Sequence, residues 1–171
     1  MVRILTAEEV TARTRELGGV LLDAVEGGAS VSFMAGFSPA EAEEFYAKAG
    51  REAAAGRRIV FAAFEGAALV GTVQLLLDTP PNQPHRAEIA KMLVLRSARR
   101  RGHARALMLA AEAEAKARGR TLLTFDTMAG SAAEKLYLGL GYVRAGEIPR
   151  YALYPDGSGP AATTILYKLL A

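Results

Sequence analysis

The chain has 171 residues, of which 51% are hydrophobic and 23% are charged, the balance of a globular domain with a buried core. It contains no cysteine, which excludes disulfides, thiolate metal sites and cysteine nucleophiles, and its two histidines are too few to predict a zinc site. It lacks a run of about 18 apolar residues and the apolar core of a signal peptide, so we expect one cytoplasmic domain over residues 1–171.

The positive charge is small in total and concentrated in one place. The net charge is +3, yet five arginines lie between Arg96 and Arg105. Binding to nucleic acid usually needs a larger and broader excess of charge, so we expect no nucleic-acid partner and keep that function as a third alternative. A compact polyanion fits this patch better, while the alternative without a ligand is a solvated loop.

The first third of the chain predicts a short strand and two helices. Residues 3–5 form the strand, and Thr6 with Glu9 forms a capping box for a helix that ends near residue 27. The apolar residues 29–37 are expected as a loop packed near the substrate site. Ser38 begins a second helix, with proline at its first position, that runs to about residue 55.

The middle of the chain predicts a hairpin, a further strand and a helix. Residues 58–64 and 67–77 read as paired strands, and residues 87–95 as a largely buried strand. A basic loop with Gly102 follows, and a helix begins at His103. A strand, a glycine-bearing loop and a helix leave backbone N–H groups unpaired in a positive field, which favours phosphate binding.

The last third predicts three strands and one short helix. Residues 121–127 form a strand, Ser131 and Glu134 cap a helix through Leu140, and residues 142–153 and 161–170 form the closing strands. The sequence contains no internal repeat and no linker.

The central segment resembles a known family. Arg99, Gly102 and Ala104 match the Arg/Gln-x-x-Gly-x-Gly/Ala signature of the GCN5-related N-acetyltransferases, the GNAT superfamily, and the matching context reaches through Tyr142. The resemblance covers Thr72 to about Lys168. It implies an α/β (α+β) fold with a mixed, mostly antiparallel sheet that splays between its fourth and fifth strands, and with helices on both faces.

The resemblance also implies acetyl-CoA as co-substrate, without a metal. In the family the loop grips the pyrophosphate, and pantetheine enters the splay, where a backbone N–H of the preceding strand polarises the thioester carbonyl. The cofactor-binding residues implied are Leu93, Val94, Leu95, Arg99, Arg100, Arg101, Gly102, His103, Ala104, Arg105 and Ser131. His103 is expected to offer only its N–H, because neighbouring arginines disfavour its charged form.

Two carboxylates are candidates for the base that deprotonates the acceptor amine. Glu88 matches the position of the base in histone-type members, and burial would raise its pKa; the alternative is an ion pair with Arg86 or Lys91. Asp126 lies at the end of a strand, where open α/β sheets present ligand-binding residues, or else it caps the turn at residues 130–131.

Tyr137 is the remaining catalytic candidate. Residues 136–142 resemble the family's Tyr-x-x-x-Gly-Phe/Tyr segment, whose tyrosine protonates the departing thiolate; the alternative is an aromatic residue of the core. Asp126, Tyr137 and residues 148–152 also resemble a narrower group, the tabtoxin-resistance acetyltransferases. Lys91 is unusual in a buried strand, and it either extends past the sheet or faces the acceptor pocket.

The function that these features imply is transfer of an acetyl group from acetyl-CoA to a primary amine of a small molecule, by direct attack in a ternary complex. The principal alternative is a non-catalytic acyl-CoA-binding module of the same fold. A homodimer is compatible with the resemblance. The residues do not identify the acceptor, because acceptor specificity lies in loops that diverge freely.

Overall fold

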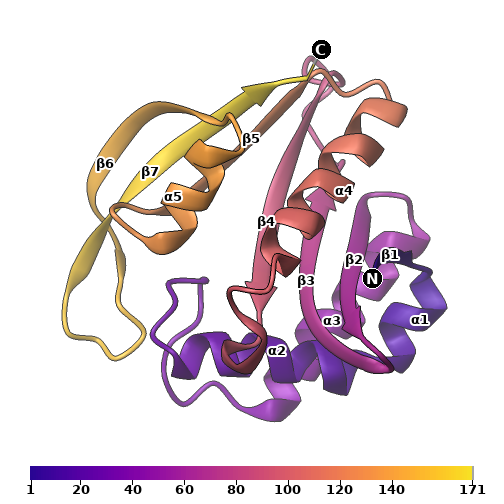
Figure 1. The fold of residues 1–171 in the computed structure, drawn as a ribbon, viewed down its shortest axis with the longest axis vertical. Helices are drawn as coiled ribbons and strands as arrows, with labels where there is room; N and C mark the ends of the chain where they lie inside the picture. Colours follow the sequence, from indigo (N-terminus) through magenta and orange to yellow (C-terminus); the bar gives the residue numbers. More distant parts are fainter. Residues whose placement is uncertain (171) are drawn as a thin grey trace.

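A computed structural model describes residues 1–170 and shows a mixed sheet in the order β1-β2-β3-β4-β5-β7-β6 (Figure 1). Strands β4 and β5 are parallel, and all other neighbours pair antiparallel. This arrangement confirms the predicted fold class. The strands are β1 (Val2–Leu5), β2 (Arg58–Glu65), β3 (Ala68–Leu76), β4 (Arg86–Val94), β5 (Leu122–Met128), β6 (Val143–Leu153) and β7 (Pro160–Leu169).

Helices cover both faces of the sheet. Three of them, α1 (Ala7–Ala12), α2 (Thr14–Glu26) and α3 (Pro39–Ala54), pack on one face and enclose one apolar core. On the other face α4 (His103–Ala117) and α5 (Ala132–Gly139) enclose a second core. In Figure 1, α4 lies across β2, β3 and β4, while α5 lies beside β5. No helix among residues 1–170 has the length and apolarity that a membrane span requires.

The helix starts confirm the capping signals, and one prediction is corrected. Thr6 and Ser38 each accept the N–H of a glutamate three residues later, and that glutamate accepts the cap's own N–H. The helix expected from residue 6 to about 27 is two helices, because the backbone leaves the helical region at Arg13 (φ −109°, ψ 18°). Val10 and Leu17 stay in one core across the break, so the apolar spacing gives no sign of it.

The sheet splits between β4 and β5. These strands pair only where Arg86–Glu88 faces Leu122–Thr124, and they diverge beyond that point (Figure 1). On its other edge β4 holds one extra residue, because Thr72 and Gln74 of β3 pair with Leu93 and Ala90. This bulge centres on Lys91, whose φ of 49° is unusual for a residue with a side chain.

The bulge reverses the faces of β4. Ile89 packs in the core under α4, whereas Leu93, four residues on, packs in the core under α1–α3. In a regular strand these two residues would share a face. The bulge therefore turns Lys91 away from the α4 face, and the unpaired part of β4 borders an open gap.

Candidate active site

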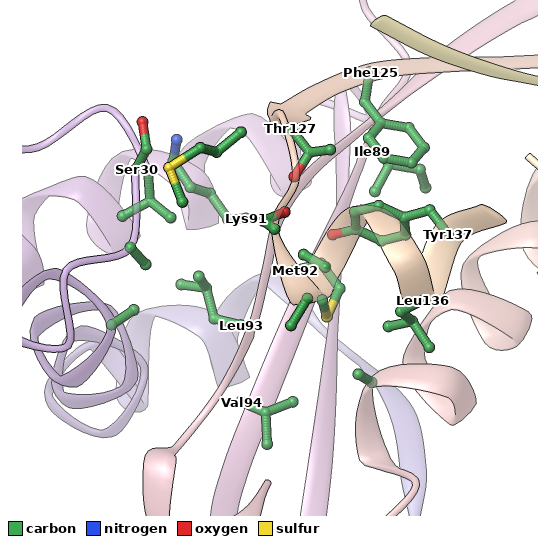
Figure 2. Close-up of a pocket in the computed structure, with 18 of the residues that line it drawn as sticks. Ser30, Ile89, Lys91, Met92, Leu93, Val94, Phe125, Thr127, Leu136 and Tyr137 are labelled. Atoms are coloured by element: carbon green, nitrogen blue, oxygen red, sulfur yellow. The ribbon is translucent and has the colours of Figure 1, made fainter. Parts of the chain in front are cut away.

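A cavity of about 750 Å³ occupies the gap between β4 and β5. The Ala98–Arg105 region and α5 border it on the α4 face, and the loop after α2 borders it on the opposite face. Figure 2 shows the side chains of β4, β5 and α5 converging on it. The parts of the chain that line it are residues 24, 27–32, 88–94, 98–100, 102–105, 125–128, 131–133, 136–137, 151–152 and 161–163.

One end of the cavity is a helix start with free backbone donors. Gly102 is the N-cap of α4, with φ 85° and no side-chain cap, and the first intrahelical bond runs from the Ala106 N–H to the Gly102 carbonyl. Within residues 1–170, the N–H groups of His103, Ala104 and Arg105 have no acceptor. A Cβ placed on Gly102 would meet no atom within 4 Å, so the space before these donors is open.

The arginine run divides into residues that hold the fold and residues that face the cavity. Arg96 pairs with Asp23, and Arg101 pairs with Glu65 at 2.9 Å. Arg99, Arg100 and Arg105 line the cavity without a carboxylate partner among the described residues. Arg101 does not line the cavity, and its place in the cofactor site stays a prediction.

Two further predicted residues have different surroundings from those expected. The Nε2 atom of His103 lies 2.7 Å from Glu65, so this histidine faces a carboxylate as well as arginines. Glu65 is 38 residues earlier in the chain, which is why the local sequence did not reveal it. Leu95 does not line the cavity, and its N–H already donates to Val70 at 2.9 Å. Leu93 and Val94 do line it.

Tyr137 combines a buried ring with a hydroxyl that reaches the cavity. Its side chain is 5% exposed, and its ring meets Phe125 edge to face at 4.7 Å between centroids. In Figure 2 the hydroxyl oxygen points from α5 toward β4. Burial raises the pKa of Tyr137, so the hydroxyl keeps its proton at neutral pH and can donate it.

The two candidate carboxylates both line the cavity but differ in their partners. Glu88 pairs with Arg86 at 2.6 Å, and its side chain is 45% exposed; Asp126 is exposed too, so neither carboxylate has the burial expected for a base. Asp126 forms no ion pair within residues 1–170 and lies 2.7 Å from the Thr163 hydroxyl. It does not cap the turn at residues 130–131, because Glu134 accepts the Gly130 N–H there.

Ser131 and Lys91 complete the set of predicted residues, and both line the cavity. Ser131 is the N-cap of α5, and its hydroxyl oxygen accepts the Glu134 N–H at 3.1 Å. Lys91 extends toward the loop after α2, where its ammonium lies 3.2 Å from Ser32 (Figure 2). That loop, predicted to lie near the substrate site, contributes residues 29–32 to the wall.

These features fit acetyl-CoA. Open N–H donors and three unpaired arginines suit a pyrophosphate, and an open strand edge beside a buried hydroxyl suits an extended thioester arm. On the β5 side of β4, the backbone has no partner strand beyond Glu88 within the described chain, which leaves room and hydrogen-bonding groups for that arm.

Three solved structures share this architecture over nearly the whole chain. An N-acetyltransferase from Staphylococcus aureus Mu50 has a TM-score of 0.82 and 20% identity, covering 100% of this chain and 98% of its own. Ribosomal-protein-alanine N-acetyltransferase from Brucella melitensis has a TM-score of 0.81 and 21% identity, covering 99% of both chains. A protein from Salmonella typhimurium, assigned as an acetyltransferase and solved with its cofactor acetyl-CoA, has a TM-score of 0.80 and 14% identity, covering 100% and 94%.

At these identities the likeness shows the fold alone. The sequence match is more specific, because the model of the Acetyltransferase (GNAT) family matches residues 22–142, which include the arginine loop, Asp126 and Tyr137. The chain belongs to the Acetyltransferase (GNAT) family, whose activity is acetyl transfer from acetyl-CoA.

Proposed function

We propose that the protein transfers the acetyl group of acetyl-CoA to a primary amine of a small molecule, by direct attack while both substrates are bound. The observation that carries this proposal is that one cavity joins a helix start with free N–H donors, a buried tyrosine hydroxyl and a carboxylate without a cationic partner among residues 1–170. No cysteine is present to form a thioester with the acetyl group, and direct attack requires no covalent intermediate.

Each group in the cavity has a place in this reaction. Acetyl-CoA supplies the acetyl group as a thioester. The N–H groups of the α4 start, with Arg99, Arg100 and Arg105, would hold its pyrophosphate. A backbone N–H of Leu93 or Val94 would polarise the carbonyl, as expected of donors placed where negative charge develops.

The proton transfers complete the balance of the reaction. The amine nitrogen forms a bond to the carbonyl carbon as the carbon–sulfur bond breaks. Tyr137 gives its proton to the departing sulfur, and a carboxylate takes a proton from the amine. We assign this second role to Asp126, because Glu88 is already held by Arg86 while Asp126 is free of a cationic partner within residues 1–170.

The narrower resemblance to the tabtoxin-resistance acetyltransferases rests on sequence motifs around Asp126 and Tyr137 and supports their proposed roles. It does not identify the acceptor, since acceptor specificity lies in loops that diverge freely. The alternative function is an acyl-CoA-binding module without turnover.

Thiol release from acetyl-CoA, measured with a panel of small primary amines, tests the proposal. We expect release that depends on the amine, falls in Asp126→Asn and Tyr137→Phe, and gives the N-acetylated amine by mass spectrometry. Tight acetyl-CoA binding by calorimetry, without release for any amine, would favour the binding module. The same titration with CoA alone controls for the nucleotide part of the interaction.

A further inference from the structure

Among residues 1–170, Lys91 is the one lysine in the wall of the cavity, and the bulge of β4 determines where it points. Because the bulge reverses the faces of β4, its side chain crosses to the α2–α3 side instead of packing under α4. There the ammonium lies 3.2 Å from the Ser32 hydroxyl, and it is 5.5 and 5.9 Å from the ring centroids of Phe33 and Phe45. This is the end of the cavity away from the arginine loop.

The ammonium has attractive neighbours but no counter-ion. Within residues 1–170, no carboxylate forms an ion pair with Lys91, and the rings and the hydroxyl only partly replace the water that its burial removes. Burial lowers the pKa of Lys91, and the nearby Arg58 guanidinium acts in the same direction, while Asp126 opposes both. Arg58 itself is neutralised by Glu52. A cation held in this way is stabilised by an anion that enters the cavity.

The charges across the cavity constrain the acceptor. Asp126, which has no cationic partner among residues 1–170, supplies the unpaired negative charge of the acceptor end, and Lys91 supplies the positive charge. An acceptor that carries only an ammonium would bring a second positive charge near Lys91, and the two would repel each other in this partly desolvated space. An acceptor with a carboxylate beside its amine matches both signs.

Resting on the proposed function, we propose that the acceptor is a small amino acid-like molecule, whose carboxylate is bound by the Lys91 ammonium and the Ser32 hydroxyl while its amine faces Asp126. Lys91 is then a specificity-determining residue that contacts the acceptor and takes no part in the proton transfers. The α2–α3 loop, through Ser32 and Phe33, holds that ammonium in place.

Matched pairs of acceptors test this proposal. Methionine, leucine, phenylalanine and glycine are each compared with their carboxamides at saturating acetyl-CoA and pH 7.5. The amine of a carboxamide is less basic, so more of it is neutral at this pH and simple reactivity favours the amide. We nevertheless expect kcat/KM to favour the carboxylate by about 10- to 100-fold, the range of a charge-assisted hydrogen bond.

Variants of Lys91 separate recognition from folding. Lys91→Met removes the charge, and Lys91→Arg keeps it; both have an unbranched Cβ, so neither changes the backbone constraint at φ 49°. In Lys91→Met we expect the preference for the carboxylate to fall to about onefold or to reverse in favour of the amide, through a higher KM for the carboxylate acceptor with kcat and the KM for acetyl-CoA little changed. Lys91→Arg should keep most of the preference. An unchanged preference in a folded Lys91→Met protein would overturn the proposal.

A binding measurement distinguishes this inference from the proposed function. N-acetylmethionine and its amide, titrated into the protein with CoA present, differ only in the carboxylate and need no turnover. Tighter binding of the acid, lost in Lys91→Met, would support the inference even if no amine is acetylated. Turnover with equal use of acids and amides would overturn the inference and leave the proposed function intact. Acetylation of Lys91 itself, detected by mass spectrometry with acetyl-CoA alone, would also overturn it.

Discussion

The two ends of the cavity are built from the chain in different ways. At the cofactor end, one continuous segment, residues 98–105, supplies the helix start, its free N–H groups and three unpaired arginines. At the acceptor end, the wall is assembled from residues 29–32, 88–92, 126–128, 151–152 and 161–163, which belong to different elements. Backbone groups dominate the first end and side chains the second. Such a cavity can keep one donor substrate while its acceptor changes, because substitutions at the second end leave the helix start intact.

Tyr137 lies between these ends, and removing its hydroxyl should give the largest effect. Because Tyr137→Phe keeps the ring and its contact with Phe125, we expect near-normal melting temperature and acetyl-CoA affinity, but turnover lower by about 10²–10⁴-fold. Tyr142→Phe is the matched control, since Tyr142 packs on the same Phe125 ring and lies outside the cavity lining. Full turnover in Tyr137→Phe would assign the residue to packing and leave the thiolate to another donor.

Substitutions of the two carboxylates at the acceptor end should change the pH dependence of turnover. Asp126→Asn should lower turnover by about 10²-fold at neutral pH, with partial recovery as pH rises and more amine loses its proton. Glu88→Gln should have the smaller effect, because Glu88 is held by Arg86. Burial raises the pKa of Tyr137, so its proton is retained and should cause no loss of rate below about pH 10.

Turnover of both variants with one amine between pH 6 and 10 checks this order. Near-normal rates for both across that range would assign proton removal to water. A larger loss of turnover in Glu88→Gln than in Asp126→Asn would make Glu88 the base. Arg86 would then have to release Glu88 when the acceptor binds.

Substitutions of the arginines at the cofactor end should lower the affinity for acetyl-CoA moderately. Arg99→Ala, Arg100→Ala and Arg105→Ala should each raise the KM for acetyl-CoA by about 3- to 10-fold, and less at high salt, because these side chains are exposed. Arg101→Ala is the matched control, since its guanidinium pairs with Glu65 outside the cavity lining. An equal rise in Arg101→Ala would show that the whole run, and not three members of it, holds the phosphates.

The cofactor end is built from one segment and the acceptor end from several, and this explains how much of the site could be predicted from the sequence. The arginine loop follows from contiguous residues, whose backbone geometry a short motif describes, whereas the splay of the sheet was expected from the family resemblance. The direction of Lys91 could not be predicted, because it depends on a bulge that reverses the faces of β4 between Ile89 and Leu93. The partners of Glu88 and His103 were only partly foreseen, since Arg86 is a neighbour in sequence whereas Glu65 approaches His103 from the β2–β3 hairpin.

Ser131 should give the smallest effect, and it tests where the cofactor end stops. Its oxygen caps α5 by accepting the Glu134 N–H, which leaves its O–H free to donate to a ligand in the cavity. Ser131→Ala loses both functions and should cost about 1 kcal/mol of unfolding free energy, or roughly 2–4 °C in melting temperature. Ser131→Asn restores the cap without the hydroxyl, so its melting temperature should match that of the unmodified protein. If the hydroxyl contacts acetyl-CoA, both variants raise the KM by a similar small factor. A KM that rises only in Ser131→Ala would mean that the residue acts solely by holding α5, and through it Tyr137, in place.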